Sequence, residues 1–349
     1  MDWELGKRLI ADVGKWKESW VWVEEPYASP DGEKVAAIVR TEDEMFNVCV
    51  NGESWENSFD KIWYLRFSPD NRLTAIVSDG EWTLAIDGET WENRFDYLWN
   101  TQFGQDGTNI VAATQSDRKY AAVGNDTAWE NSFSFMTQLA LNHDGSQTAA
   151  IVQTVPVKEG DIFKFQEGCY TIAVNGEAWK RNFVNVWSPI FSSDGKSVAA
   201  EARLNLYEYT IVVNGKPWNK SFATVWAPQF NPADGSVTAP VRKDGKWFLA
   251  RDGEIIWTKP FEQLWHHQYS ADGRKIAAIA SPEFGRWTVA VNGNCWHHTF
   301  EELVTDLTIS PDGSRIACVG KDNGKYFVCV DGIVWNEAYD MVFPPVFSP

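Results

Sequence analysis

Histidine and cysteine are the residues of this sequence that could hold a metal ion or act as nucleophiles, and both are scarce. The five histidines are His143 and the adjacent pairs His266-His267 and His297-His298. Neighbouring residues in a β-strand point to opposite faces, so neither pair forms a chelating site by itself. No cysteine or carboxylate stands beside them at the spacing that a zinc site requires. We therefore expect surface histidines and no bound metal.

The five cysteines form no paired motif. The sequence has no C-x-x-C and no C-x-x-C-H, the spacings of zinc, iron–sulfur and covalent haem sites. Cys49 and Cys329 each lie in a V-C-V run, and Cys318 follows an apolar run. These three are predicted to be small core residues. An odd number of cysteines fits reduced thiols in a cytoplasmic chain.

Other catalytic motifs are absent as well. The sequence contains no G-x-S-x-G, no P-loop and no Rossmann fingerprint. Aspartate recurs in turns, where it caps the backbone, but carboxylates from distant repeats could still meet as an acid–base pair. The sequence thus predicts no catalytic, cofactor-binding or metal-binding residue, and a protein that is not an enzyme.

The charge of the chain limits its partners. Lys and Arg number 31 against 48 Asp and Glu, a net charge of −17. Such a surface repels nucleic-acid phosphates and anionic lipid. Solubility alone explains this charge, and docking to a basic partner is the functional alternative. No apolar run approaches the length of a membrane span, and no apolar signal segment follows Met1, so we expect a cytoplasmic chain without direct membrane insertion.

The elements that would position any site follow from the 20 tryptophans. Eight of them, the anchor tryptophans, recur with gaps of 36, 38, 50, 39, 39, 39 and 39 residues. Four residues after each anchor comes another aromatic, and eight after it there is usually a second Trp. A period near forty is typical of a propeller or solenoid. The anchors are Trp55, Trp91, Trp129, Trp179, Trp218, Trp257, Trp296 and Trp335.

Turn signals divide each repeat into four strands. A Ser-Pro-Asp-Gly type turn follows the aromatic strand, as at Ser310-Pro311-Asp312-Gly313, and an Ala-rich strand comes next. A further apolar strand then ends in Asn-Gly or Asp-Gly, as at Asn292-Gly293, a strong hairpin signal. Aromatics at every fourth position could also line a helix, but the Asn-Gly before the anchor favours strands. Four antiparallel strands per repeat predict a propeller blade.

The predicted fold is therefore all-β, a β-propeller in a single domain over residues 1–349 with repeats of about 39 residues. We expect the anchor tryptophans to be largely buried between blades. The 50-residue gap contains residues 153–168, an inserted loop or hairpin that is either a binding feature or a neutral extension.

The two ends predict how a ring of blades would close. Phe347-Ser348-Pro349 stops inside the turn signature, and Gly6–Ala11 resembles a second strand. We expect the segment from Leu9 to Val13 to pair with the segment from Val346 to Ser348, which removes free sheet edges. This arrangement gives about nine blades, eight complete and one mixed from N- and C-terminal strands. Eight blades is the alternative.

The S-P-D-G turn followed by an Ala/Val strand resembles WD40-like, or TolB-like, propeller repeats over nearly the whole chain. The additional W-x-x-x-F-x-x-x-W frame is similar to the tryptophan-rich D subunit of the Tmc transmembrane electron-transfer complex of sulfate-reducing bacteria. This resemblance implies a cytoplasmic accessory subunit, peripheral to the inner membrane through its complex. The implied partners are cytochrome b, iron–sulfur and multihaem cytochrome subunits, and the resemblance supplies no catalytic residue.

Two functions remain after this reading. The leading hypothesis is a non-catalytic scaffold that docks protein partners in a membrane-associated electron-transfer complex. The alternative is a stand-alone propeller enzyme, or a sugar or peptide binder, with its site in the central channel. Fold alone does not decide between them.

Overall fold

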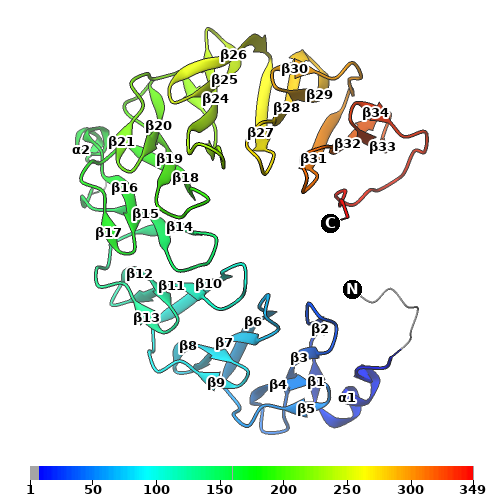
Figure 1. The fold of residues 1–349 in the computed structure, drawn as a ribbon. Coiled ribbons are helices and arrows are strands. Elements are labelled where there is room, and N and C mark those ends of the chain that lie inside the picture. Colours follow the sequence, from blue (N-terminus) through cyan, green and yellow to red (C-terminus); the bar gives the residue numbers. More distant parts are fainter. Residues whose placement is uncertain (1–7, 159, 349) are drawn as a thin grey trace. The chain divides into compact units, whose positions relative to one another are not determined.

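The computed structural model describes residues 8–158 and 160–348. The chain forms two compact units, Met1–Thr148 and Ala149–Pro349. Its strands form eight four-stranded antiparallel sheets, which are blades of the propeller type (Figure 1). The predicted fold class is confirmed. The number of sheets is eight, which the sequence left open as the alternative to nine. Single-domain organisation stays a prediction.

The first unit contains three sheets and one further strand. Each sheet has its strands in chain order, and in the first sheet the first strand is broken into β1 and β2, which both pair with β3. The first sheet consists of β1 (Trp22–Val23), β2 (Tyr27–Ala28), β3 (Val35–Arg40), β4 (Phe46–Val50) and β5 (Glu53–Ser54). The second consists of β6 (Lys61–Phe67), β7 (Leu73–Asp79), β8 (Glu81–Ile86) and β9 (Glu89–Thr90). The third consists of β10 (Tyr97–Phe103), β11 (Ile110–Ser116), β12 (Lys119–Gly124) and β13 (Thr127–Ala128), and β14 (Met136–Leu141) follows it.

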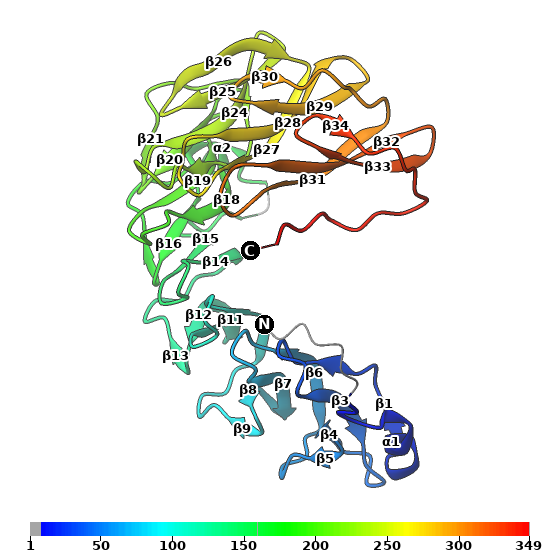
Figure 2. The ribbon, with the colours of Figure 1, turned by 45° about the vertical axis from the view of Figure 1, so that its right-hand side comes forward.

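The second unit continues the same pattern, and its successive sheets lie side by side (Figure 2). After β15 (Thr148–Gln153) come β16 (Tyr170–Val174) and β17 (Glu177–Ala178). The fifth sheet consists of β18 (Asn185–Phe191), β19 (Val198–Arg203), β20 (Tyr209–Val213) and β21 (Lys216–Pro217). The sixth consists of β22 (Thr224–Val225), β23 (Gln229–Phe230), β24 (Val237–Lys243), β25 (Lys246–Arg251) and β26 (Glu254–Phe261). The seventh consists of β27 (Gln263–Tyr269), β28 (Ile276–Glu283), β29 (Arg286–Val291) and β30 (Asn294–Cys295), and the eighth of β31 (Leu303–Ile309), β32 (Ile316–Asp322), β33 (Lys325–Val330) and β34 (Ile333–Val334).

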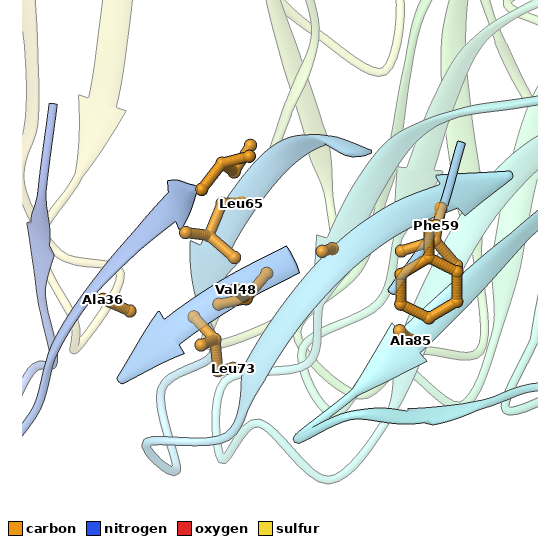
Figure 3. Packing of buried hydrophobic residues seen from close by; sticks show 9 residues of the cluster. Ala36, Val48, Phe59, Leu65, Leu73 and Ala85 are labelled. Carbon is orange, nitrogen blue, oxygen red and sulfur yellow. The ribbon is translucent and has the colours of Figure 1, made fainter. Parts of the chain in front are cut away.

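The Ala-rich second strands are apolar on both faces because each has a sheet or the neighbouring repeat on either side. Between the first two sheets, Ala36, Val48 and Phe59 pack against Leu73 and Ala85 (Figure 3). Small alanines in the central strands let adjacent sheets approach closely, so the core is a series of layers between sheets rather than one central mass.

The aromatic that follows each anchor by four residues extends the fourth strand. Phe95 bridges to Trp82 of the third strand, and Phe300 bridges to Trp287 in the same antiparallel manner. The anchor region is therefore β structure, and the helical alternative for the aromatic spacing is excluded.

Five of the eight anchor tryptophans pack against a glycine in the hairpin turn of the next sheet. A Cβ added to Gly293, whose φ is +81°, would lie 3.3 Å from the Trp257 ring. Glycine is needed there both for the left-handed backbone and for the space that the indole fills. The same contact recurs at Trp55 with Gly88, Trp179 with Gly215, Trp218 with Gly253 and Trp296 with Gly332.

Burial of the anchors follows this packing. Trp91 and Trp257 are buried, and five others are partly buried. Trp335, the anchor of the eighth sheet, is 54% exposed. The expected burial is confirmed for the anchors that have a following sheet in the sequence and is wrong for Trp335, after which no described strand follows β34.

A short helix, α1 (Val13–Ser19), takes the place of an anchor at the start of the chain. Trp16 on α1 is 4% exposed and packs with Ala37, Val39 and Cys49 of the first sheet. Its Nε1 atom lies 3.6 Å from the position of a Cβ on Gly52, the turn glycine of that sheet. The helix thus supplies the indole that a preceding sheet supplies elsewhere.

The expected mixed ninth blade is corrected by these elements. Leu9 to Asp12 have no strand structure, and Val13 begins α1, because Trp16 gains more burial on a helix that covers the first sheet. Residues 341–348 also carry no strand. Gly6 and Lys7, part of the proposed second-strand pattern, lie outside the described residues.

A substitution at Gly320 tests how tightly adjacent sheets are packed. A Cβ at Gly320 would lie 2.3 Å from the Phe300 ring of the preceding sheet. We expect Gly320→Ala to lower the free energy of unfolding by about 1–3 kcal/mol, measured by urea denaturation, because the ring must move. Gly124→Ala is the matched control, since its Cβ would make only an ordinary contact, at 3.5 Å, with Val111. Equal losses in the two variants would contradict close packing at Gly320, and Phe300→Leu should relieve the loss.

Candidate functional site

The expectation of surface histidines is wrong for His267, which is buried. His266 is exposed at a strand bulge with φ +50°, whereas His267 is 3% exposed, so the pair points to opposite sides as predicted. His297 and His298 are both exposed. Within residues 8–158 and 160–348, no group of three or more His, Cys, Asp or Glu side chains could hold a metal ion.

The cysteines behave as core residues. Cys49, Cys318 and Cys329 are fully buried, as predicted from their apolar surroundings. Cys318 and Cys329 lie directly opposite each other on β32 and β33. Burial and the neighbouring thiol raise the pKa of Cys318 far above its ordinary value. The two cysteines are eleven residues apart in the sequence, so only the register of the two strands shows that they are neighbours.

Glu201 is a mostly buried carboxyl that sequence reasoning missed. It lies on β19 opposite Trp187, at the position that Ile76 and Ile279 occupy in the second and seventh sheets. Ser188, at a bulge with φ +51°, donates a hydrogen bond to Glu201 at 2.8 Å. Burial raises the pKa of Glu201 to about 7, only partly offset by that hydrogen bond. The sequence signal for this site was a single polar residue at a position of the repeat that is apolar in other sheets.

The negative charge is concentrated in the first unit. Residues 1–148 contain 12 Lys and Arg against 26 Asp and Glu, a net charge of −14. Residues 149–349 contain 19 against 22, a net charge of −3. A basic partner would therefore be attracted to the first unit, and composition of the whole chain concealed this difference.

Many of these carboxylates gather at one end of the first three sheets, where the first strand of a sheet begins and its second strand ends. The Asp60 backbone N–H donates to Asp79 at 3.1 Å, and the Asp117 backbone N–H donates to Asp96 at 2.9 Å. These hydrogen bonds place the hairpin between the second and third strands beside the start of the first strand. We call this surface the acidic end; it comprises the exposed residues Glu42, Asp43, Glu44, Asp60, Asp79, Glu81, Asp96 and Asp117.

Exposed aromatic rings share the acidic end. Trp63, at the start of β6, is 53% exposed and stacks on Trp82 with ring centroids 5.2 Å apart. Tyr64, at the bulge of the same strand, and Tyr97, the first residue of β10, are also exposed. The Lys61 ammonium lies 5.9 Å from the Trp82 ring centroid, so this stack already accommodates a cation.

The insertion between β15 and β16 carries a short helix, α2 (Ile162–Glu167), in place of a hairpin. Asp161 caps it by accepting from the Lys164 backbone N–H. Phe165 packs edge-on against Tyr170, which leaves Phe163 82% exposed. The insertion thus presents an apolar side chain from the nearly neutral unit.

Comparison with known proteins gives a likeness in fold. No family model and no curated protein matches the chain. Among solved structures, a eukaryotic initiation factor is similar at TM-score 0.48 and 14% identity, covering 91% of this chain and 89% of that one. The Dos1 propeller is similar at TM-score 0.42 and 14% identity, covering 89% of this chain and 91% of that one. TolB from Acinetobacter baumannii is similar at TM-score 0.35 and 16% identity, covering 96% and 88% of the two chains.

No helix within the described residues has the length and apolar character that crossing a membrane requires. The scaffold function stays a prediction, and so does its alternative, an enzyme or a sugar or peptide binder with its site in the central channel.

Proposed function

We propose that this protein is a non-catalytic binding scaffold whose acidic end docks the basic surface of a partner protein. The observation that carries this proposal is the coincidence, in one unit, of a net charge of −14 with the exposed Trp63–Trp82 stack. Carboxylates steer a basic surface toward the site over distances that salt screens. Aromatic faces then hold Lys and Arg side chains by cation–π contact.

The resemblance in the tryptophan frame suggests where such a partner would be found. It points to a membrane-associated electron-transfer complex, with cytochrome b, iron–sulfur and multihaem cytochrome subunits as candidate partners. In that assembly the chain would be peripheral to the membrane and would contribute binding surface only. Purified protein is then colourless and free of metal and flavin, and stoichiometric metal or flavin would overturn the scaffold assignment.

Binding of cationic peptides tests the acidic end. We expect labelled oligo-arginine and oligo-lysine peptides to bind the full chain in fluorescence anisotropy, with an affinity that falls as salt rises. Neutralising Glu42, Asp43 and Glu44 together to amides should weaken binding at least about tenfold at low salt, since each exposed charge contributes a fraction of a kcal/mol or more to the encounter. Trp63→Ala should lower the affinity for arginine peptides. It should change the dependence of that affinity on salt to a smaller degree.

The matched control removes three exposed carboxylates from the second unit, Glu167, Glu283 and Glu337, as amides. It changes the total charge by the same amount but leaves the acidic end intact. Equal weakening by both triple variants would show a general charge effect and contradict the site. A separate pull-down experiment with a native partner uses a variant that lacks residues 153–168. Loss of the partner there would assign the contact to α2 and Phe163 instead.

A further inference from the structure

The sixth sheet departs from the repeat at several stations. Its first strand is split into β22 and β23, and both pieces pair with β24. Its first turn, Asn231-Pro232-Ala233-Asp234-Gly235, is one residue longer than Ser270-Ala271-Asp272-Gly273 in the seventh sheet. Sequences that break their own repeat do so most often where the site has a function.

Polar residues replace apolar ones between the sixth and seventh sheets. Arg251 ends β25 where Val213 and Val291 end the equivalent strands of the fifth and seventh sheets. Tyr269 ends β27 where Phe103 and Phe191 end theirs. His267, two residues before Tyr269, stands where β6, β14 and β31 have the leucines Leu65, Leu139 and Leu307.

Hydrogen bonding fixes the protonation of this cluster. His267 Nε2 lies 3.2 Å from the Thr238 carbonyl oxygen and 3.0 Å from Thr238 Oγ1. A carbonyl only accepts, so Nε2 carries the hydrogen, and the Thr238 hydroxyl donates its own hydrogen to the Gln229 carbonyl oxygen at 3.4 Å. Burial lowers the pKa of His267 to about 4, which keeps the ring neutral near pH 7. Burial also raises the pKa of Tyr269, which therefore keeps its proton.

Two donors in the cluster lack an acceptor. Arg251 Nε and Tyr269 Oη are both buried and make no hydrogen bond of normal geometry among the described residues, although Thr238 and Arg251 lie close enough to the Tyr269 hydroxyl to lower its pKa against the larger effect of burial. Asp234, the nearby carboxylate, already accepts from the Ser236 backbone N–H and hydroxyl at 2.9 and 2.6 Å. No ion pair in the described part of the chain includes Arg251. Buried donors of this kind cost free energy unless something accepts from them.

We propose that Arg251 and Tyr269 form a binding site for a small anion with two or more acceptor oxygens, a carboxylate or an inorganic oxyanion. Arg251 supplies a permanent positive charge, and the Tyr269 hydroxyl supplies a further donor. The permanent charge of the guanidinium favours an anion over a neutral water at this position, because hydrogen bonds between charged partners are the stronger ones. The neutral His267 holds Thr238 in place and positions its hydroxyl.

Thermal unfolding of the full chain tests the site with sodium phosphate and sodium acetate, each against sodium chloride at equal ionic strength. We expect a saturable rise in Tm with at least one of the two anions, as for any ligand that binds the folded state. Tyr269→Phe and Arg251→Val should abolish that saturable rise. Both variants restore the residue that other sheets carry, so they should fold and be at least as stable as the wild type without the anion.

The two anions distinguish the sources of the ligand. A response to phosphate alone identifies an inorganic oxyanion, and a response to acetate alone identifies a carboxylate such as a chain terminus or acidic side chain. Phosphate also stabilises proteins nonspecifically by exclusion from their surface, an effect that the variants share. Equal Tm responses in wild type, Tyr269→Phe and Arg251→Val, or no saturation in the wild type, would overturn the proposal.

Discussion

Trp257→Ala is expected to lower the free energy of unfolding by about 3–5 kcal/mol, the usual cost of removing a large core aromatic. Trp257 is 6% exposed and packs against Leu264, Ala278 and the turn at Gly293. The substitution leaves a cavity between the sixth and seventh sheets that rigid strands cannot close. Urea denaturation followed by tryptophan fluorescence and by far-ultraviolet circular dichroism measures the loss.

Trp335→Ala is the matched control because Trp335 occupies the same station of the repeat but is 54% exposed. We expect it to cost less than about 1 kcal/mol, as for most exposed positions. A similar loss in both variants would show that the anchors act through something other than packing on the next sheet. A small loss in both would refute the contribution of the anchor stations to stability.

Glu201→Gln is expected to stabilise the protein above pH 7 and to have little effect near pH 4.5. The raised pKa means that folding favours the protonated carboxyl. Its favourable contribution is complete below the ordinary value of 4.5 and is lost as pH rises through about 7. A shift of this size corresponds to about 3 kcal/mol, which Gln, always neutral, does not lose. Urea denaturation at pH 5 and pH 8.5 measures the difference.

Comparison with an exposed carboxyl isolates this effect. Glu167→Gln removes the same charge from the surface of α2 and should change stability equally at both pH values. His267 loses its own contribution as pH falls from 6.5 toward about 4, so variant and wild type must be compared at each pH. A pH-independent effect of Glu201→Gln would mean that Glu201 titrates normally in the folded protein.

The repeat made most of the fold predictable, because turn chemistry and aromatic spacing act locally. Asp and Asn at the hairpin turns adopt the left-handed φ that those types favour, as at Asn292 with φ +47°. The Ser-Asp turn closes as expected, with the Ser310 hydroxyl donating to Asp312 at 2.6 Å. Strand order and the position of the aromatic stations therefore followed from sequence.

The ends and the site were less predictable because they depend on contacts between distant residues. An apolar strand pattern near Leu9 suggested pairing with the C-terminal segment. The structure instead forms a helix there, which buries Trp16 against Gly52. The acidic end required knowing which hairpins share one end of a sheet, as Asp60 and Asp79 do. Arg251 and Glu201 became informative only once strand register aligned them with apolar residues of other repeats.

The contact between Trp16 and Gly52 has a consequence for self-association. The turn glycines Gly88, Gly215, Gly253, Gly293 and Gly332 each contact an indole of the sheet before them, and in the first sheet the Trp16 indole of α1 takes that place beside Gly52. By filling this position with a residue of its own chain, α1 covers apolar surface that would otherwise favour association between copies, as capping repeats do in other repeat proteins.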